Sequence, residues 1–238
     1  VLALLGIVVV WRLVPDAPQR PAEASEGGGR VLHHVLWHPE LLRLNLRIFI
    51  LHLVQMAMFV AVPVALVEHA GWPVSSHGWV YLPVVLGSFV LMLPPLLWSE
   101  KRGRVRAVFL GSVALLALTE LLLARLWTEP VALVALLLAF FVGFNILEAS
   151  LPSLVSRVAP AAGKGLALGI YNTTQSLGLF CGGWLGGRIA AAHGYEGVFQ
   201  CWAGFLLLWP VLAWPMRPPA RQRAVVEAAE PGSASAAT

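Results

Sequence analysis

One carboxylate, Glu148, lies inside a long apolar stretch that runs from Val131 to Pro152. No Lys or Arg occurs within one helical turn of it. A charged side chain in the hydrocarbon core of a membrane costs about 2.5 to 3.5 kcal/mol on insertion scales. We therefore expect Glu148 to face a cavity or to hold a proton, since burial disfavours the ionised carboxylate. This is the chemistry of a proton carrier; the alternative is a hydrogen bond that ties two helices together.

A histidine and two carboxamides accompany this carboxylate in apolar surroundings. His52 and Gln55 are three residues apart in an earlier stretch. Imidazole exchanges protons near neutral pH, so His52 is a second candidate proton carrier, although a lone histidine can also simply bond a partner helix. Asn145 lies three residues before Glu148 and on the same helix face, so we expect it to hydrogen-bond the carboxyl group.

A further apolar stretch carries both polar residues and regularly spaced glycines. Asn172 and Gln175 share a helix face, where they either line a polar path or tie helices together. Gly178, Gly182 and Gly186 follow at intervals of four. Small residues at this spacing let another helix backbone approach closely. The glycine series therefore predicts a helix-packing face, in either a sliding or a static contact.

Apolar stretches of membrane-spanning length must position all of these side chains. Hydrophobic residues make up 58% of the chain and charged residues 12%, where soluble proteins carry about 25% charged residues. Six stretches have about the 20 residues that cross a hydrocarbon core, and the first is shorter. We predict an all-α fold, a polytopic membrane helix bundle of six transmembrane helices plus the end of a seventh. The stretches are Val1–Trp11, Leu44–Val67, Trp79–Trp98, Ala107–Trp127, Val131–Pro152, Gly165–Ala191 and Val198–Met216.

Positive charge falls on every second connection between these stretches. Of the 16 Lys and Arg residues, all except Arg125 and Arg188 follow this pattern. Cytoplasmic connections of inner-membrane proteins carry the excess of Lys and Arg. We therefore expect an inner (cell) membrane protein with a cytoplasmic carboxyl terminus. The residues on the cytoplasmic side are Arg12, Arg20, Arg30, Arg43, Arg47, Lys101, Arg102, Arg104, Arg106, Arg157, Lys164, Arg217, Arg221 and Arg223.

The membrane segments lack the usual constellations of an enzyme active site. The only Asp, Asp16, lies outside them, and none carries two His, or a His and a carboxylate, at i, i+4. His33, His34 and His38 have no Cys or carboxylate cluster nearby to complete a set of metal ligands. The basic residues lack the interleaved aromatic residues of a nucleic-acid site, despite a pI of about 9.6. We expect no enzymatic activity, metal, cofactor or nucleic-acid partner.

Composition divides the chain into four parts. The chain does not begin with Met, and we expect residues 1–14 to be the end of a transmembrane helix whose beginning precedes them. Residues 15–43 are predicted to form a cytoplasmic linker, rich in Pro, Ala, Glu and Gly, in which Val31–Leu42 forms a short amphipathic helix on the membrane surface. Residues 44–216 form the six-helix domain, and residues 217–238 a disordered cytoplasmic tail.

The connection Ser99–Arg106 carries a short charged motif. It is similar to the acidic, basic, any, Gly, Arg loop signature of the major facilitator superfamily, at the place where the second half of a twelve-helix transporter repeats it. It departs from the signature in having Leu96 where a leading Gly is expected and a Glu in place of the usual Asp. The matching residues are Glu100, Lys101, Gly103 and Arg104.

Further stretches resemble one branch of this superfamily, the YajR-type bacterial proton-coupled exporters. The similarity spans nearly the whole chain, and it lies in Leu42–His52, Phe144–Leu154, Lys164–Gly165 and Tyr171–Gln175. The halves of these transporters are repeats joined by a long linker. The resemblance implies the carboxyl-terminal half of a twelve-helix proton-coupled antiporter that exports a small molecule.

This resemblance assigns expected roles to individual residues. The implied partners are the lipid bilayer, a small-molecule substrate, protons and a missing amino-terminal half of six helices. An intramembrane enzyme is disfavoured, and an orphaned half or scaffold without transport activity of its own remains an alternative. Proton coupling is expected at Glu148 and His52, and the substrate pathway is expected at Asn45, Gln55, Asn145, Asn172 and Gln175.

Overall fold

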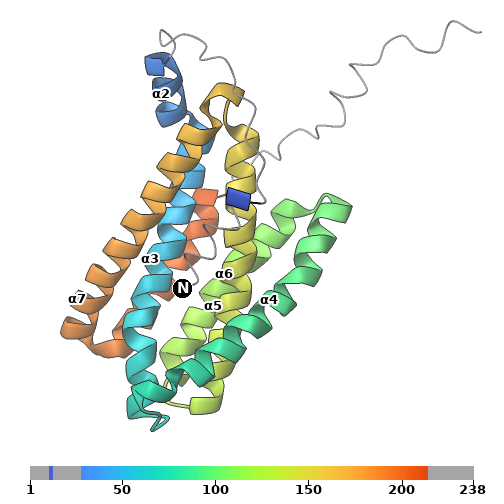
Figure 1. Cartoon of the computed structure of the whole chain (residues 1–238). Coiled ribbons are helices and arrows are strands. Elements are labelled where there is room, and N and C mark those ends of the chain that lie inside the picture. Colours follow the sequence, from blue (N-terminus) through green and yellow to red (C-terminus); the bar gives the residue numbers. More distant parts are fainter. Residues whose placement is uncertain (1–10, 13–27, 214–238) are drawn as a thin grey trace, which may run out of the picture.

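The described part of the chain is built from helices (Figure 1). The computed structural model describes residues 11, 12 and 28–213, and these contain no β-strand. The all-α fold class is thereby confirmed. The helices are α2 (Gly28–Trp37), α3 (Pro39–Glu68), α4 (His77–Arg102), α5 (Val105–Leu126), α6 (Pro130–Val158) and α7 (Lys164–Ala213), with 3-10 turns η2 at Val74–Ser76 and η3 at Ala161–Gly163.

Four of these helices, α3 to α6, are long and apolar enough to cross a membrane. The shortest of them, α5, has 22 residues, which at 1.5 Å per residue matches a hydrocarbon core about 30 Å thick. Helices α3, α4 and α6 each contain one predicted apolar stretch, and α5 contains all of Ala107–Trp127 except its last residue. The membrane-helix prediction is therefore confirmed for these four.

The last two predicted stretches lie in a single helical trace, α7. This trace has 50 residues and is broken at Gly194, whose φ of 75° and ψ of 176° are not helical. Gly165–Ala191 lies before the break and Val198–Met216 begins after it, with its last three residues outside the described part. A positive φ is accessible to glycine without a Cβ clash, so Gly194 lets the chain turn between two limbs. The count of six spans remains a prediction.

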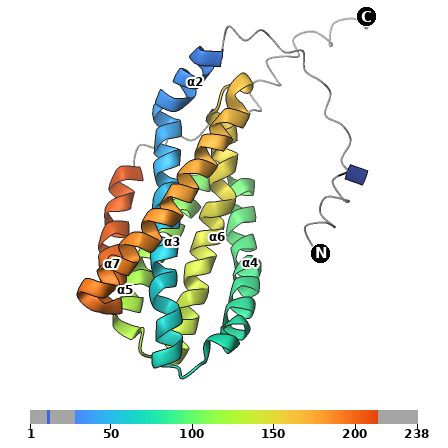
Figure 2. The ribbon, with the colours of Figure 1, turned by 60° about the vertical axis from the view of Figure 1, so that its left-hand side comes forward.

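Helix α3 lies at the centre of the packing, with the first limb of α7 beside it and α6 close by (Figures 1 and 2). Its buried side chains run from Leu41 to Leu66 and form a large part of the core. The second limb of α7 packs on α5, where Trp127 contacts the rings of Tyr195 and Phe199. Helix α4 lies at the edge beside α6, and most of its large apolar side chains are exposed.

The end of the predicted linker differs from the expectation. A helix over Val31–Leu42 was predicted, whereas the structure has α2 ending at Trp37 and α3 beginning at Pro39. Proline suits the first position of a helix because it has no backbone N–H to leave unpaired, so it starts a new helix here. Trp11 and Arg12 are helical. The other residues of 1–14 and the tail 217–238 lie outside the described part.

Candidate functional site

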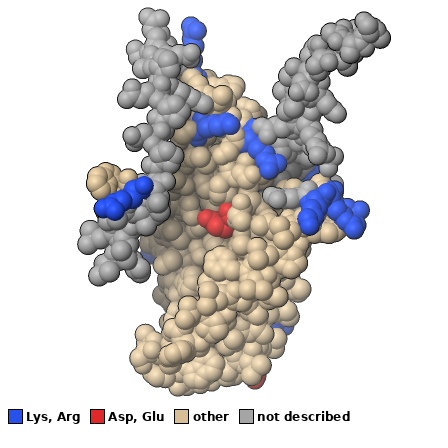
Figure 3. All heavy atoms as spheres, turned by 45° about the vertical axis from the view of Figure 1, so that its right-hand side comes forward, with Lys and Arg blue, Asp and Glu red and all other residues tan. Residues whose placement is uncertain are grey.

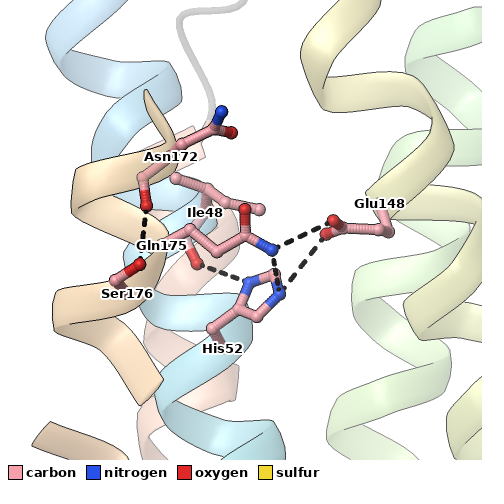
Figure 4. Close-up of polar contacts among 6 residues, drawn as sticks. All are labelled: Ile48, His52, Glu148, Asn172, Gln175 and Ser176. Atoms are coloured by element: carbon pink, nitrogen blue, oxygen red, sulfur yellow. Dashed lines mark hydrogen bonds and ion pairs between the residues drawn. The ribbon is translucent and has the colours of Figure 1, made fainter. Parts of the chain in front are cut away.

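Three helices bring His52, Glu148 and Gln175 together (Figure 4). His52 comes from α3, Glu148 from α6 and Gln175 from the first limb of α7. The His52 side chain is only 5% exposed, whereas the Glu148 side chain is 33% exposed. The site is therefore shielded from the surroundings at His52 and partly accessible at Glu148, which we call its open side.

The carboxamide of Gln175 bridges the two candidate proton carriers. Its Nε2 lies 2.7 Å from His52 Nε2 and donates a hydrogen bond of 3.2 Å to Glu148 Oε1. His52 Nε2 lies 3.6 Å from Glu148 Oε2, a distance at which they form an ion pair only if the imidazole is protonated. Gln175 was predicted as a pathway residue, and the structure places it in direct contact with both proton-carrier candidates.

The hydrogen bonds of His52 define its proton state in this arrangement. Its Nδ1 lies 3.2 Å from the Ile48 carbonyl oxygen, which can only accept, so Nδ1 carries the proton. In a neutral imidazole the other nitrogen is then an acceptor, and it accepts from the Gln175 amide. The Phe144 ring packs edge-on against the imidazole with 5.4 Å between ring centroids. The geometry is that of a neutral histidine beside a carboxyl group.

Asn145 does not bond Glu148, in contrast to the expectation. Its Nδ2 donates a hydrogen bond of 2.8 Å to Ser88 Oγ on α4. The Ser88 hydroxyl donates its own proton to the Val85 carbonyl. The lone pairs of Ser88 Oγ are therefore free to accept the hydrogen bond from Asn145. Side chains three residues apart on a helix diverge by about 60°. That divergence turns Asn145 toward α4 while Glu148 faces α3 and α7.

The remaining predicted pathway residues do not join this cluster. Asn172 is exposed, and its backbone carbonyl accepts a hydrogen bond of 3.0 Å from Ser176 Oγ (Figure 4). Asn45 and Gln55 are half-buried on α3. Within the described residues, none of these three carboxamides hydrogen-bonds His52, Glu148 or Gln175.

The glycine series of α7 lies directly against the backbone of α3. A Cβ on Gly178 or Gly182 would overlap the carbonyl oxygen of Phe49 or Leu53, respectively. A Cβ on Gly186 would lie 2.9 Å from the Cα of Ala57. Only glycine fits this approach, and the same close approach brings Gln175 within reach of His52.

Comparison with known proteins places this bundle in a family. Residues 44–237 match the Major Facilitator Superfamily. The chain belongs to the major facilitator superfamily. The predicted resemblance is confirmed, and the chain is related to membrane transporters rather than to enzymes.

The superfamily relatives of the chain are transporters about twice its length. It is 36% identical over 220 residues to the inner membrane transport protein YajR of Escherichia coli (strain K12), which covers 92% of this chain and 48% of that protein. It is 27% identical over 184 residues to the uncharacterized transporter BU466 of Buchnera aphidicola subsp. Acyrthosiphon pisum (strain APS), covering 76% of this chain and 47% of the relative. A third relative, the 3-(3-hydroxy-phenyl)propionate transporter of Escherichia coli (strain K12), is 34% identical over 125 residues, 52% of this chain and 28% of its own length. The chain thus spans about half the length, or less, of the curated relatives it matches.

The superfamily loop signature forms a tight turn between α4 and α5. Gly103 has a positive φ of 64°, which permits the reversal. The guanidinium groups of Arg102 and Arg104 lie over the Trp98 ring, 5.9 and 5.3 Å from its centroid. Lys101 is exposed, and the side chain of Glu100 lies outside the described part. Lys and Arg gather mainly around this end of the molecule, while the middle shows an acidic spot in a largely uncharged surface (Figure 3).

Glu120 is a second carboxylate inside a membrane-length helix. Its side chain on α5 is 0% exposed, and neither oxygen has a hydrogen-bond partner among the described residues. Arg125, the nearest basic residue along the same helix, is exposed. Residues five apart on a helix diverge by about 140°, which explains why Arg125 does not reach the carboxyl group. The absence of a cation at i+3 or i+4 was the signal available in the sequence.

Proposed function

We propose that this chain is the carboxyl-terminal half of a proton-coupled antiporter that exports a small molecule across the inner membrane by alternating access. The observation that carries the proposal is the cluster of His52, Gln175 and Glu148, in which three helices meet at two titratable groups. Titratable side chains at membrane depth are costly, and they mark proton or substrate pathways in transporters.

Proton binding would rearrange the contacts within this cluster. A proton on His52 Nε2 converts that nitrogen from an acceptor into a donor. The Gln175 Nε2–H group, 2.7 Å away, can then no longer donate to that nitrogen, so the present hydrogen bond is lost. The new N–H can turn to Glu148 Oε2, now 3.6 Å away, and form an ion pair. Protonation thereby exchanges a contact between α3 and α7 for one between α3 and α6, and this exchange couples proton binding to helix movement.

The exposed faces of the bundle favour a second, missing half. Helix α4 exposes Leu86, Val90 and Leu93, and the first limb of α7 exposes Phe180 and Trp184. The chain also covers 48% of its relative YajR. In transporters of this kind the substrate site lies near the membrane midplane between two repeats. An opposing six-helix half would close the open side of Glu148 and complete that site.

The surroundings of Glu148 favour a class of substrate. The Phe144 ring packs on His52 beside the carboxyl group, and the half-buried or exposed carboxamides Asn45, Gln55 and Asn172 add uncharged polar groups on α3 and α7. An apolar cavity with one carboxylate suits lipophilic cationic compounds. The basic end at Arg102 and Arg104 is assigned to the cytoplasm, together with the carboxyl terminus.

The alternative is an orphaned half or membrane scaffold without transport activity of its own. The observation that favours it is the coverage of about half of the relatives. Each helix satisfies its own backbone hydrogen bonds, so half of such a transporter can insert into a bilayer alone. In such an isolated half, no second set of helices would cover Glu148 and Gln175.

Proton flux in proteoliposomes tests the proposed function. The chain is reconstituted with its amino-terminal half around an internal pH-sensitive dye, and a fluorescent lipophilic cation is added as the substrate probe. Glu148→Gln keeps the size and most hydrogen bonds of the side chain but removes the titratable proton, so probe-driven proton flux should fall to background. Glu129→Gln, at the exposed N-cap of the same helix, is the matched control and should transport normally. Equal flux in both variants would make Glu148 a structural link between helices.

A further inference from the structure

Two buried polar atoms in the proposed coupling site lack hydrogen-bond partners. One is the hydroxyl of Tyr171 and the other is Glu148 Oε2, and neither has a partner among the described residues. Tyr171 is 2% exposed. Leaving a buried polar group unpaired costs free energy, so such groups in native proteins call for an explanation.

The two side chains are related through Gln175. Tyr171 lies one helical turn before Gln175, on the same face of α7. Gln175 donates to the other oxygen of the same carboxylate, Glu148 Oε1. The Glu148 charge also acts electrostatically on the Tyr171 hydroxyl. A phenol can donate and a carboxylate oxygen can accept, so the two unpaired groups are chemically complementary.

We propose that Tyr171 is a positioning residue whose hydroxyl donates a hydrogen bond to Oε2 of the deprotonated Glu148 in the proton-releasing conformation. This inference rests on the proposed function. In that conformation the carboxyl group gives its proton to water on the open side of the site, and Tyr171 keeps its own proton. Gln175 on Oε1 and Tyr171 on Oε2 then hold the carboxylate from one helix, α7.

In this arrangement the hydrogen bonds from α7 to Glu148 on α6 depend on whether Glu148 is protonated. A protonated carboxyl has one oxygen occupied as an O–H donor, so it cannot accept from both side chains in the same way. A hydrogen bond made only to the charged form favours that form and therefore favours proton release. Among the described residues, the titratable groups that interact with Glu148 are His52 from α3, at 3.6 Å, and Tyr171 from α7, on which its charge acts.

Infrared spectroscopy of the reconstituted two-half transporter tests this proposal without a substrate. The stretching band of the protonated Glu148 carboxyl is followed through a pH titration and assigned by its loss in Glu148→Gln. Tyr171→Phe removes only the hydroxyl and keeps the buried ring. Without this hydrogen bond to a charged group, the midpoint of proton release should move upward by about one to two pH units.

Tyr81→Phe is the matched control, because the Tyr81 hydroxyl on α4 is also buried and unpaired but its ring packs on Phe59 and His77. It should leave the midpoint unchanged. A midpoint in Tyr171→Phe equal to that of the wild type, or an equal shift in both Tyr variants, overturns the role of Tyr171 and leaves the proposed function standing. If no titrating band is lost in Glu148→Gln, the proposed function itself fails, and the role of Tyr171 fails with it.

Discussion

The contact between the glycine series and α3 predicts opposite outcomes for two glycines five residues apart. Gly182→Ala places a methyl group on the Leu53 carbonyl, whereas a methyl group at Gly187 meets nothing within 4 Å. To restore an ordinary contact of about 3.5 Å, α7 has to move away from α3 by about 1 Å. Because Gln175 lies on the same limb, its 2.7 Å contact with His52 would then exceed the range of a hydrogen bond, which ends at about 3.2 Å.

The energetic cost follows from the same displacement. Overpacking a tight contact costs about 1–3 kcal/mol, and a lost buried hydrogen bond adds about 0.5–1.5 kcal/mol. At about 2–4 °C per kcal/mol, Gly182→Ala should lower the Tm by on the order of 5 °C or more. Gly187→Ala should leave the Tm unchanged or raise it slightly, because alanine favours the helix.

Thermal unfolding of the detergent-solubilised protein measures this difference, and the proton-flux assay measures its effect on the proposed coupling site. We expect Gly182→Ala to lose both stability and flux, and Gly187→Ala to keep both. Equal Tm values for the two variants would show that α7 and α3 are not held by this glycine contact. A normal proton flux in a destabilised Gly182→Ala variant would show that the contact of Gln175 with His52 and Glu148 does not depend on the glycine contact.

Three further predictions test the topology, the buried acid and the proposed amino-terminal half. A membrane-impermeant thiol reagent added to intact cells, in a background without Cys181 and Cys201, should label Ser76→Cys and spare Arg104→Cys; labelling of Arg104→Cys alone would mean that the orientation is inverted. Glu120→Gln should change the free energy of unfolding by less than about 1 kcal/mol if the fully buried carboxyl is already neutral, and a loss of several kcal/mol in a denaturant titration would contradict this. Purified residues 1–238 alone should show no substrate-driven proton movement in proteoliposomes, and co-expression with the amino-terminal half should restore it. Robust transport by the isolated chain would identify a self-sufficient carrier instead.

Local pattern was sufficient to predict the helices α3 to α6 and to single out Glu148 and the glycine series as features of interest. Uninterrupted apolar runs predicted the membrane helices, because a helix is the way for one segment to pair its own backbone groups in lipid. The cost of a charge at membrane depth singled out Glu148. The spacing of Gly178, Gly182 and Gly186 predicted a close helix contact, since residues four apart share one face. Each of these inferences depends on neighbours within a few turns of the same helix.

The pairings between helices were decided by the tertiary structure. Gln175 meets His52 across 123 residues and Glu148 across 27, and Asn145 bonds Ser88 across 57. A side chain's helix face can be read from spacing, but which helix packs against that face depends on the contacts of all the others. This is why α3 could not be named as the partner of the glycine series, and why Asn145 was assigned to Glu148. For the same reason only the packing showed that the polar groups of Tyr171 and Glu120 are buried without hydrogen-bond partners among the described residues.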